Sequence, residues 1–422
     1  MTAGTSQPRK RRVHLGQGGR LLGAVAVAAA WSVGFVAAAP SAAAVDVQSQ
    51  QWYLGAMHAE EMWKSTTGEG IKVAVIDTGV NSSTPSLQGQ VLRGLDATGA
   101  EGDETDDYNG HGTTMAELIA GTGRDGGLKG LAPGVKIVPM RVADTDFQNK
   151  HAVNVYDTAD SIRAAADSDV KIISMSFGSE FKMDQEIEAV KYAHSKGKLF
   201  FAAVGNDAKR GNKPIYPAAY PEVVGVGGTD QQGKASETSQ HGAFVDIAAP
   251  GEDIPYWCDG NTGRYCQGGS GTSAATALTS AAAALIWSAH PEWTANQVLN
   301  VLFDTAGRGG NWEKGTLSNY LGHGIIRPAV NILKGKGTPG DPDISPLTHE
   351  KTSHSTGSAA PSAPTSAEPQ KDGQADDAAV AGPGTEKNDD DQLVWILGGV
   401  AAVLVLGAAA FALVRQRRAP GD

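Results

Sequence analysis

Short hydrophobic runs recur through the middle of the chain, separated by stretches that read as helices. Five such runs occur, at residues 71–77, 136–142, 170–176, 198–204 and 222–228. Each is nearly continuous rather than alternating, which is typical of parallel strands buried on both faces. Residues 158–169 and 183–197 read as helices between them. This alternation predicts an α/β fold with a mainly parallel, doubly wound sheet and helices on both faces.

The N-terminal end has the layout of a secretory signal. Basic residues 9–12 precede an apolar stretch at 21–39, and small residues follow it. This order of charge and hydropathy is that of a signal peptide. We expect residues 1–44 to be removed by cleavage after Ala44; an uncleaved membrane anchor is the alternative.

A second apolar segment lies near the C-terminus. Residues 393–414 form a run of 22 residues without a charge, followed at once by RQRR. This length suffices to cross a bilayer, and the positive-inside rule places the basic end in the cytoplasm. We predict a transmembrane helix at 392–414, a cytoplasmic tail at 415–422 and a body held outside the plasma membrane. A buried core helix is the alternative.

The segment between the body, residues 45–335, and this helix differs in composition. Residues 337–391 hold seven prolines and no Phe, Trp or Tyr, so they cannot bury enough apolar surface to offset the entropy of ordering. We predict a disordered linker at 336–391. The eleven acidic residues and three lysines of residues 337–391 account for −8 of the chain's net charge of −11. The acidic balance therefore says nothing about the substrate, and no nucleic-acid signature appears.

The chain has two cysteines, Cys258 and Cys266, which flank a turn containing Gly and Asn. In an exported protein such a pair is expected to form a disulfide that closes a hairpin. A zinc site would need more ligands than this loop offers.

Four polar residues stand where predicted strands end or helices begin. Asp77 closes the first run and Asn206 follows the fourth, while His111 and Ser273 open predicted helices after glycine turns. Ligands gather at the carboxyl ends of such strands. Taken singly, each residue has an ordinary explanation, such as a turn former, a surface residue or, for Ser273, a helix cap.

Taken together, the four residues supply one chemistry. A serine hydroxyl becomes a nucleophile when an imidazole takes its proton, and a carboxylate fixes that imidazole. An amide donor then stabilises the developing oxyanion. The order Asp77, His111, Ser273 is one of the known orders of this triad, the order found in subtilisin.

The motifs around these residues extend the likeness. The stretches VAVIDTGV, NGHGTTMA, ISMSFGS, AAVGND, YPAAYPEVVGVGG and GTSAA resemble subtilisin-like serine proteases over about residues 50–330. The resemblance implies that Asp77 orients the imidazole, His111 is general base and then acid, and Ser273 attacks the peptide carbonyl. It implies that Asn206 donates to the oxyanion, together with the backbone N–H of Ser273.

The same resemblance implies where substrate binds. Ser176, Phe177 and Gly178 match the segment that pairs with extended substrate as an added strand. Ala203, Val204 and Gly205 match the pocket for the residue before the cut. Elsewhere the chain departs from residues common in the family, at Thr114, Ala274 and Ala277. The acidic residues 101–107 are expected to be a solvated loop rather than a Ca²⁺ site, and we predict no metal and no cofactor.

The arrangement of signal, single catalytic domain, linker and anchor, with the short lead at 51–70, resembles the mycosins. These are membrane-anchored subtilisin-like proteases associated with type VII secretion. The resemblance implies a protein or peptide substrate, limited processing and a partner complex in the plasma membrane. The alternative is a structural component of that complex with little proteolytic turnover. A nutritional protease anchored at the surface is a third possibility, which would cleave unfolded proteins broadly. A sedolisin-type peptidase and an esterase explain the motifs less well.

Overall fold

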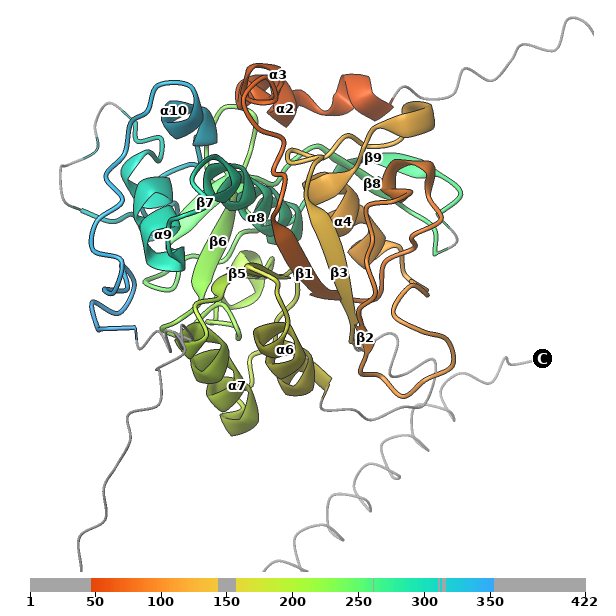
Figure 1. Ribbon diagram of the computed structural model, residues 1–422, viewed down its shortest axis with the longest axis horizontal. Coiled ribbons are helices and arrows are strands. Elements are labelled where there is room, and N and C mark those ends of the chain that lie inside the picture. Colours follow the sequence, from red (N-terminus) through yellow and green to blue (C-terminus); the bar gives the residue numbers. More distant parts are fainter. Residues whose placement is uncertain (1–46, 143–156, 261, 310–311, 313–315, 353–422) are drawn as a thin grey trace, which may run out of the picture. The chain divides into compact units, whose positions relative to one another are not determined.

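A seven-stranded sheet lies at the centre of the computed structural model, which describes residues 47–142, 157–260, 262–309, 312 and 316–352 (Figure 1). Every strand pairing in it is parallel. Across the sheet the strands are β2 (Leu95–Asp96), β3 (Lys136–Arg141), β1 (Lys72–Asp77), β4 (Ile172–Met175), β5 (Leu199–Ala203), β6 (Val224–Thr229) and β7 (Ile247–Pro250). The predicted α/β fold with a mainly parallel sheet is confirmed.

The five predicted runs became strands because both of their faces are covered. In β5, Phe201 is fully buried in the cluster that contains the residues of α8 (Thr272–Ala289). Its neighbour Phe200 is 1% exposed and belongs to the cluster on the opposite face. Successive side chains of a strand point to opposite faces, so a buried run without alternation requires helices on both sides.

Helices supply that cover. On one face α8 packs with α4 (His111–Ala120) and α9 (Ala295–Asp304). On the other face lie α6 (Asp157–Asp167) and α7 (Asp184–Ser195), which pack on each other (Figure 1). The predicted helices at 158–169 and 183–197 correspond to α6 and α7. The sequence did not predict β2 and β7, which are short edge strands.

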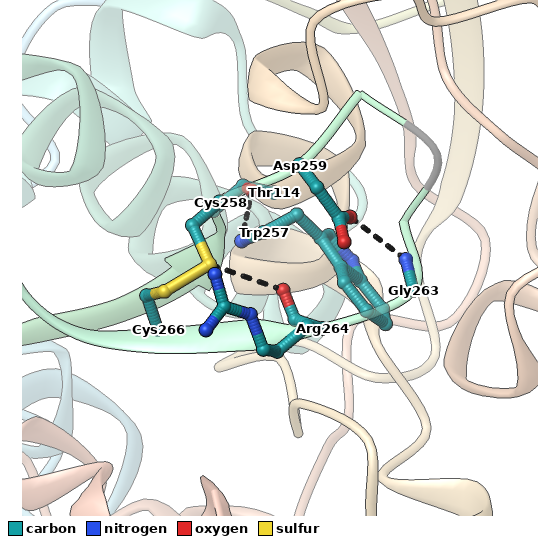
Figure 2. The surroundings of a disulfide bond; sticks show 7 residues. All are labelled: Thr114, Trp257, Cys258, Asp259, Gly263, Arg264 and Cys266. Carbon is teal, nitrogen blue, oxygen red and sulfur yellow. Dashed lines mark hydrogen bonds between the residues drawn. A yellow bond between two sulfur atoms is a disulfide. The ribbon is translucent and has the colours of Figure 1, made fainter.

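Smaller elements surround this frame. They are η1 (Val47–Gln50), α2 (Trp52–Ala56), α3 (Ala59–Met62), η2 (Pro85–Leu87), η3 (Arg124–Gly126), η4 (Ala208–Arg210) and α10 (Pro328–Ile332). An antiparallel hairpin of β8 (Ile254–Trp257) and β9 (Tyr265–Gly269) leads directly into α8. The expected disulfide between Cys258 and Cys266 closes this hairpin, with the two Cα atoms 5.5 Å apart (Figure 2).

The segment after α10 departs from the sequence prediction. Residues 336–352, expected to begin the disordered linker, lie against α9. The buried amide of Asn296 donates to the carbonyl of Pro342 at 2.9 Å and to Thr352 Oγ1 at 3.0 Å. Ser345 is 1% exposed, and Leu347 packs against the core. A segment poor in apolar residues is ordered here because it satisfies buried polar groups on α9, so the linker start at 336 is corrected.

Other predicted segments fall outside the part of the chain that the structure describes. These are the signal at 1–44, the remainder of the linker, the membrane span at 392–414 and the tail at 415–422. Among the described residues, no helix combines the length and apolar character needed to cross a membrane.

Candidate active site

Asp77 and His111 meet at the carboxyl end of β1. Asp77 is the last residue of this strand and is 3% exposed. His111 is the first residue of α4, and its Nδ1 lies 2.7 Å from Asp77 Oδ1. The backbone N–H of Thr78 also donates to Oδ1, at 2.8 Å. The carboxylate is therefore held within hydrogen-bond distance of the imidazole, where it can fix the orientation of the ring.

Gly112 permits this approach. A Cβ at Gly112 would overlap the carbonyl oxygen of Gly79 and would lie 3.1 Å from Asp77 Cβ. A glycine directly after His111 therefore lets the first turn of α4 pack onto the end of β1.

A second buried carboxylate, Asp107, organises the same junction, and sequence reasoning missed it. Asp107 is 6% exposed and accepts five hydrogen bonds. Its Oδ1 accepts from Thr78 Oγ1 at 2.9 Å and from the backbone N–H groups of Asn109 and Gly110. Its Oδ2 accepts from the backbone and the hydroxyl of Thr113, at 2.8 and 2.6 Å. Asp107 thus ties the segment after β1 to the start of α4.

This finding changes the interpretation of the acidic residues 101–107. Asp107 is buried rather than solvated, and the fully buried Arg141 donates to the backbone carbonyls of Glu101 and Asp103 at 3.0 and 2.9 Å. The loop is therefore shaped by hydrogen bonds from within. Within the described ranges, no cluster of His, Cys, Asp and Glu is suited to hold a metal ion.

Ser273 is the second residue of α8 and borders the same site. It does not cap its helix, because the N-cap is Gly271 and no side chain caps this end. Ser273 Oγ donates instead to the carbonyl of Ser176 at 2.9 Å, and Ser176 Oγ donates to the carbonyl of Ser273 at 3.1 Å. This reciprocal pair joins the start of α8 to the segment that follows β4.

Asn206 lies beside the start of α8 with its amide oriented. Its Oδ1 accepts from the backbone N–H of Thr272 at 2.9 Å and from Thr272 Oγ1 at 3.2 Å. Because Oδ1 is held by two donors, Nδ2 occupies the other position of the amide. Asn206 lines the cavity that also contains His111 and Ser273, and Nδ2 is the donor that it can offer there.

Two cavities meet at Asn206 and Ser273. One, of about 550 Å³, is lined by His111, Met115 and the β8–β9 hairpin. The other, of about 360 Å³, is lined by residues from four segments. Ser273 and Asn206 line both cavities. They thus lie at the boundary between two halves of one cleft.

The expected substrate-binding residues cluster in the second cavity, with one exception. Ser176, Phe177, Gly178, Ala203 and Gly205 all line it. Val204 does not, because it is fully buried in the core on the far side of β5.

Ile215, which sequence reasoning missed, lines this cavity too. A Cβ at Gly178 would overlap Ile215 Cδ1, and a Cβ at Gly205 would lie 2.9 Å from the same atom. The Ile215 side chain therefore fills the space between these two glycines.

Comparisons with known proteins agree with this geometry. A family model, the Subtilase family, matches residues 68–324. Thermitase of Thermoactinomyces vulgaris is 35% identical over 278 residues, which are 64% of this chain and 95% of thermitase. The thermophilic serine proteinase of Bacillus sp. (strain AK1) is 36% identical over 231 residues, 54% of this chain. The match covers 55% of that proteinase, so the chain spans about half its length.

Solved mycosin structures are similar as well. MycP1 from Mycobacterium smegmatis is 28% identical with a TM-score of 0.57, covering 69% of this chain and 86% of that one. MycP3 protease from the type VII (ESX-3) secretion system is 28% identical with a TM-score of 0.54, covering 67% of this chain and 88% of that one. With a family match over more than half of its residues, the chain belongs to the subtilase family, the subtilisin-like serine endopeptidases.

Proposed function

We propose that the chain is an exported, membrane-tethered endopeptidase that cleaves peptide bonds with Ser273 as nucleophile, His111 as general base and Asp77 as its orienting carboxylate. The observation that carries this proposal is the 2.7 Å contact between Asp77 Oδ1 and His111 Nδ1, with His111 and Ser273 on the wall of one cavity. A carboxylate, an imidazole and a serine at a helix start supply the groups that acyl transfer needs.

Attack begins with a rotation of the Ser273 side chain. Its hydroxyl donates to the carbonyl of Ser176 in this structure, so Oγ turns toward His111 Nε2 as substrate enters. His111 takes the hydroxyl proton while Oγ bonds to the scissile carbonyl carbon, and Asp77 stabilises the imidazolium. His111 then returns the proton to the leaving amine, and water repeats the sequence to release the acid.

The negative charge on the carbonyl oxygen needs donors that are already in place. Asn206 Nδ2 suits this role, because Thr272 holds the Oδ1 side of the same amide. The backbone N–H of Ser273, in the first turn of α8, is the second donor we assign. Such preorganised donors typically contribute about 10²–10³ in kcat each.

The substrate chain passes through both cavities. We place the residue before the cut in the cavity of about 360 Å³, with Ser176, Phe177 and Gly178 pairing along its backbone. The residues after the cut then lie across Ser273, in the cavity of about 550 Å³.

Hydrolysis of a casein-derived peptide mixture tests the proposal. The full-length chain should cleave it, Ser273→Ala should not, and both should fold alike. Ser280→Ala is the matched control, because Ser280 lies buried on the same helix with its hydroxyl bonded to the carbonyl of Thr276. Equal turnover by Ser273→Ala and the unaltered chain would exclude Ser273 as nucleophile.

We further propose that this activity serves limited processing linked to type VII secretion at the plasma membrane. The similarity to MycP1 and MycP3, whose structures are described as proteins of such systems, supports this link. A related MycP1 is described as an essential component of its system, which favours a second candidate role as a structural part of the complex.

Secretion assays in the native host separate these two roles. If proteolysis is needed, Ser273→Ala abolishes secretion as fully as deletion does. If the chain acts as a structural component, Ser273→Ala secretes normally and only deletion fails. Normal secretion after deletion would exclude both roles.

A further inference from the structure

The β8–β9 hairpin forms one wall of the larger cavity, and α4 faces it. Ile254, Tyr256, Trp257, Gly268 and Gly269 line the hairpin side. The α4 side is lined by His111 and, further along the helix, by Thr114 and Met115. The width of this half of the cleft therefore depends on how firmly the hairpin is docked against α4.

Glu117 lies at the centre of that docking. It is fully buried on α4, three residues after Thr114, and residues at this spacing are neighbours on a helix surface. Its Oε2 accepts from Trp257 Nε1 at 3.0 Å and from the Tyr265 hydroxyl at 2.6 Å. Trp257 is on β8 and Tyr265 on β9, where they are paired across the hairpin. One carboxylate oxygen therefore holds both strands.

Neighbouring contacts reinforce this junction. The two aromatic rings of Trp257 and Tyr265 stack with centroids 3.6 Å apart. The backbone N–H of Trp257 donates to Thr114 Oγ1 at 3.0 Å, as Figure 2 shows. The other carboxylate oxygen, Glu117 Oε1, accepts from Thr84 Oγ1 at 2.7 Å. Glu117 is thus the acceptor at which side chains from three other segments converge.

We propose that Glu117 is a positioning residue that fixes the hairpin wall of the cleft and thereby selects for substrates with residues after the scissile bond. The inference rests on the proposed function, because that function places these residues in the larger cavity. Glu117 is assigned no contact with substrate or the reacting atoms, since it is fully buried and does not line the cavity. Its burial raises the pKa of the carboxyl, while Tyr265, Thr84 and Trp257 lower it by hydrogen bonding.

Substitutions at Glu117 separate the carboxylate's hydrogen bonds from its bulk. Glu117→Leu leaves the buried Trp257 Nε1 and the half-buried Tyr265 hydroxyl without this acceptor, which loosens the hairpin. Glu117→Gln keeps an oxygen for Trp257 and Tyr265 and turns its amide toward the Thr84 hydroxyl, which can accept. Glutamine should therefore preserve the docking that leucine removes.

A matched control lies on the opposite face of the sheet. Glu186 on α7 is 7% exposed and accepts from the Tyr220 hydroxyl at 2.7 Å. Glu186→Leu removes a buried carboxylate and leaves a tyrosine hydroxyl without its carboxylate acceptor, as Glu117→Leu does. It leaves the contacts of the hairpin unchanged. Any loss of kcat/KM that both leucine variants share is therefore due to general destabilisation of the fold.

The experiment compares two substrates of the full-length chain. One is a succinyl-tripeptidyl-alanine p-nitroanilide, with no amino acid after the scissile bond. The other is an internally quenched peptide with the same tripeptidyl-alanine followed by four residues. We expect Glu117→Leu to lower kcat/KM for the quenched peptide about tenfold, mainly through KM, and for the anilide less than about twofold. Glu117→Gln and Glu186→Leu should leave the ratio of the two substrates unchanged.

Equal losses on both substrates in Glu117→Leu would overturn the proposal. If that variant does not fold, Tyr265→Phe removes one of the hairpin's bonds to Glu117 and should shift the same ratio by about threefold. If the unaltered chain cleaves neither substrate, the proposed function has failed. Hydrogen exchange of residues 254–269 then tests the docking by itself. Faster exchange in Glu117→Leu than in Glu186→Leu supports it, and equal exchange refutes it.

Discussion

Replacing Glu117 with Gln should change how the stability of the protein depends on pH. Burial of the carboxyl, opposed by hydrogen bonds from Tyr265, Thr84 and Trp257, raises the pKa of Glu117 from 4.5 to about 7. Glutamine has nearly the same shape and carries no charge at any pH. The difference in unfolding free energy between the two proteins therefore isolates the cost of the buried charge.

The sign follows from the direction of the pKa change. A carboxyl whose pKa is raised by folding binds its proton more tightly in the folded state, so its contribution to stability is complete below pH 4.5. That contribution is lost as pH rises from 4.5 through the folded pKa near 7. Above pH 7 the unfolding free energy is lowered by the full cost of burying the charged carboxylate. The pKa rises by about 2.5, and each pKa unit corresponds to about 1.36 kcal/mol, so the penalty is about 3 kcal/mol.

Equilibrium unfolding by guanidinium chloride between pH 4 and 8.5 measures this penalty. Both proteins should carry Ser273→Ala to prevent self-digestion. Relative to the parent, Glu117→Gln should gain about 3 kcal/mol between pH 4.5 and 8, most of it below pH 7. Asp246 and Glu186, whose pKa values are also raised by burial, are present in both proteins and cancel in the difference. A difference that does not vary with pH would refute the account of Glu117.

Three further substitutions test the geometry of the cleft. Asp107→Asn should lower the unfolding free energy, measured by urea titration, by about 2–4 kcal/mol, because backbone donors at the start of α4 lose an acceptor. The control Asp103→Asn, at an exposed position of the same loop, should change the unfolding free energy by less than about 0.5 kcal/mol. Ile215→Gly should enlarge the smaller cavity and so raise the ratio of kcat/KM for an anilide substrate with Phe before the scissile bond to that for one with Ala, by about 10–100-fold. An unchanged ratio would show that the substrate residue before the scissile bond does not lie in this cavity. Gly112→Ala should lower kcat/KM at least about 100-fold by driving α4 away from the carbonyl of Gly79, with circular dichroism unchanged.

The sequence predicted those parts of the fold that depend on local pattern. Runs such as 71–77 and 198–204 became β1 and β5, because strands covered on both faces must be apolar throughout. The edge strand β7 was missed, since its four residues form no such run and end in Pro250, which an edge strand tolerates. Residues 336–352 were missed because their order comes from hydrogen bonds to α9, which composition does not reveal.

The residues of the candidate site were likewise predicted where a short motif contains them and missed where distant contacts define them. Short motifs with recognisable chemistry identified Asp77, His111 and Ser273 as candidates, and the structure brings Asp77 into contact with His111. Glu117 was not identified, because its partners on the hairpin, Trp257 and Tyr265, are 140 and 148 residues away along the chain. Carboxylates whose donors come from distant segments leave no local signal. The alternative explanation of Ser273 as a helix cap is wrong, because the N-cap of α8 is Gly271.

The central claim is that Asp77, His111 and Ser273 form a working triad. Labelling of the full-length chain with a fluorophosphonate probe, followed by peptide mapping, tests it most directly, because such probes react with serines that a neighbouring base activates. We predict label on Ser273, its loss in His111→Ala and its retention in Ser280→Ala. Label on another serine, or undiminished label on Ser273 in His111→Ala, would contradict the claim.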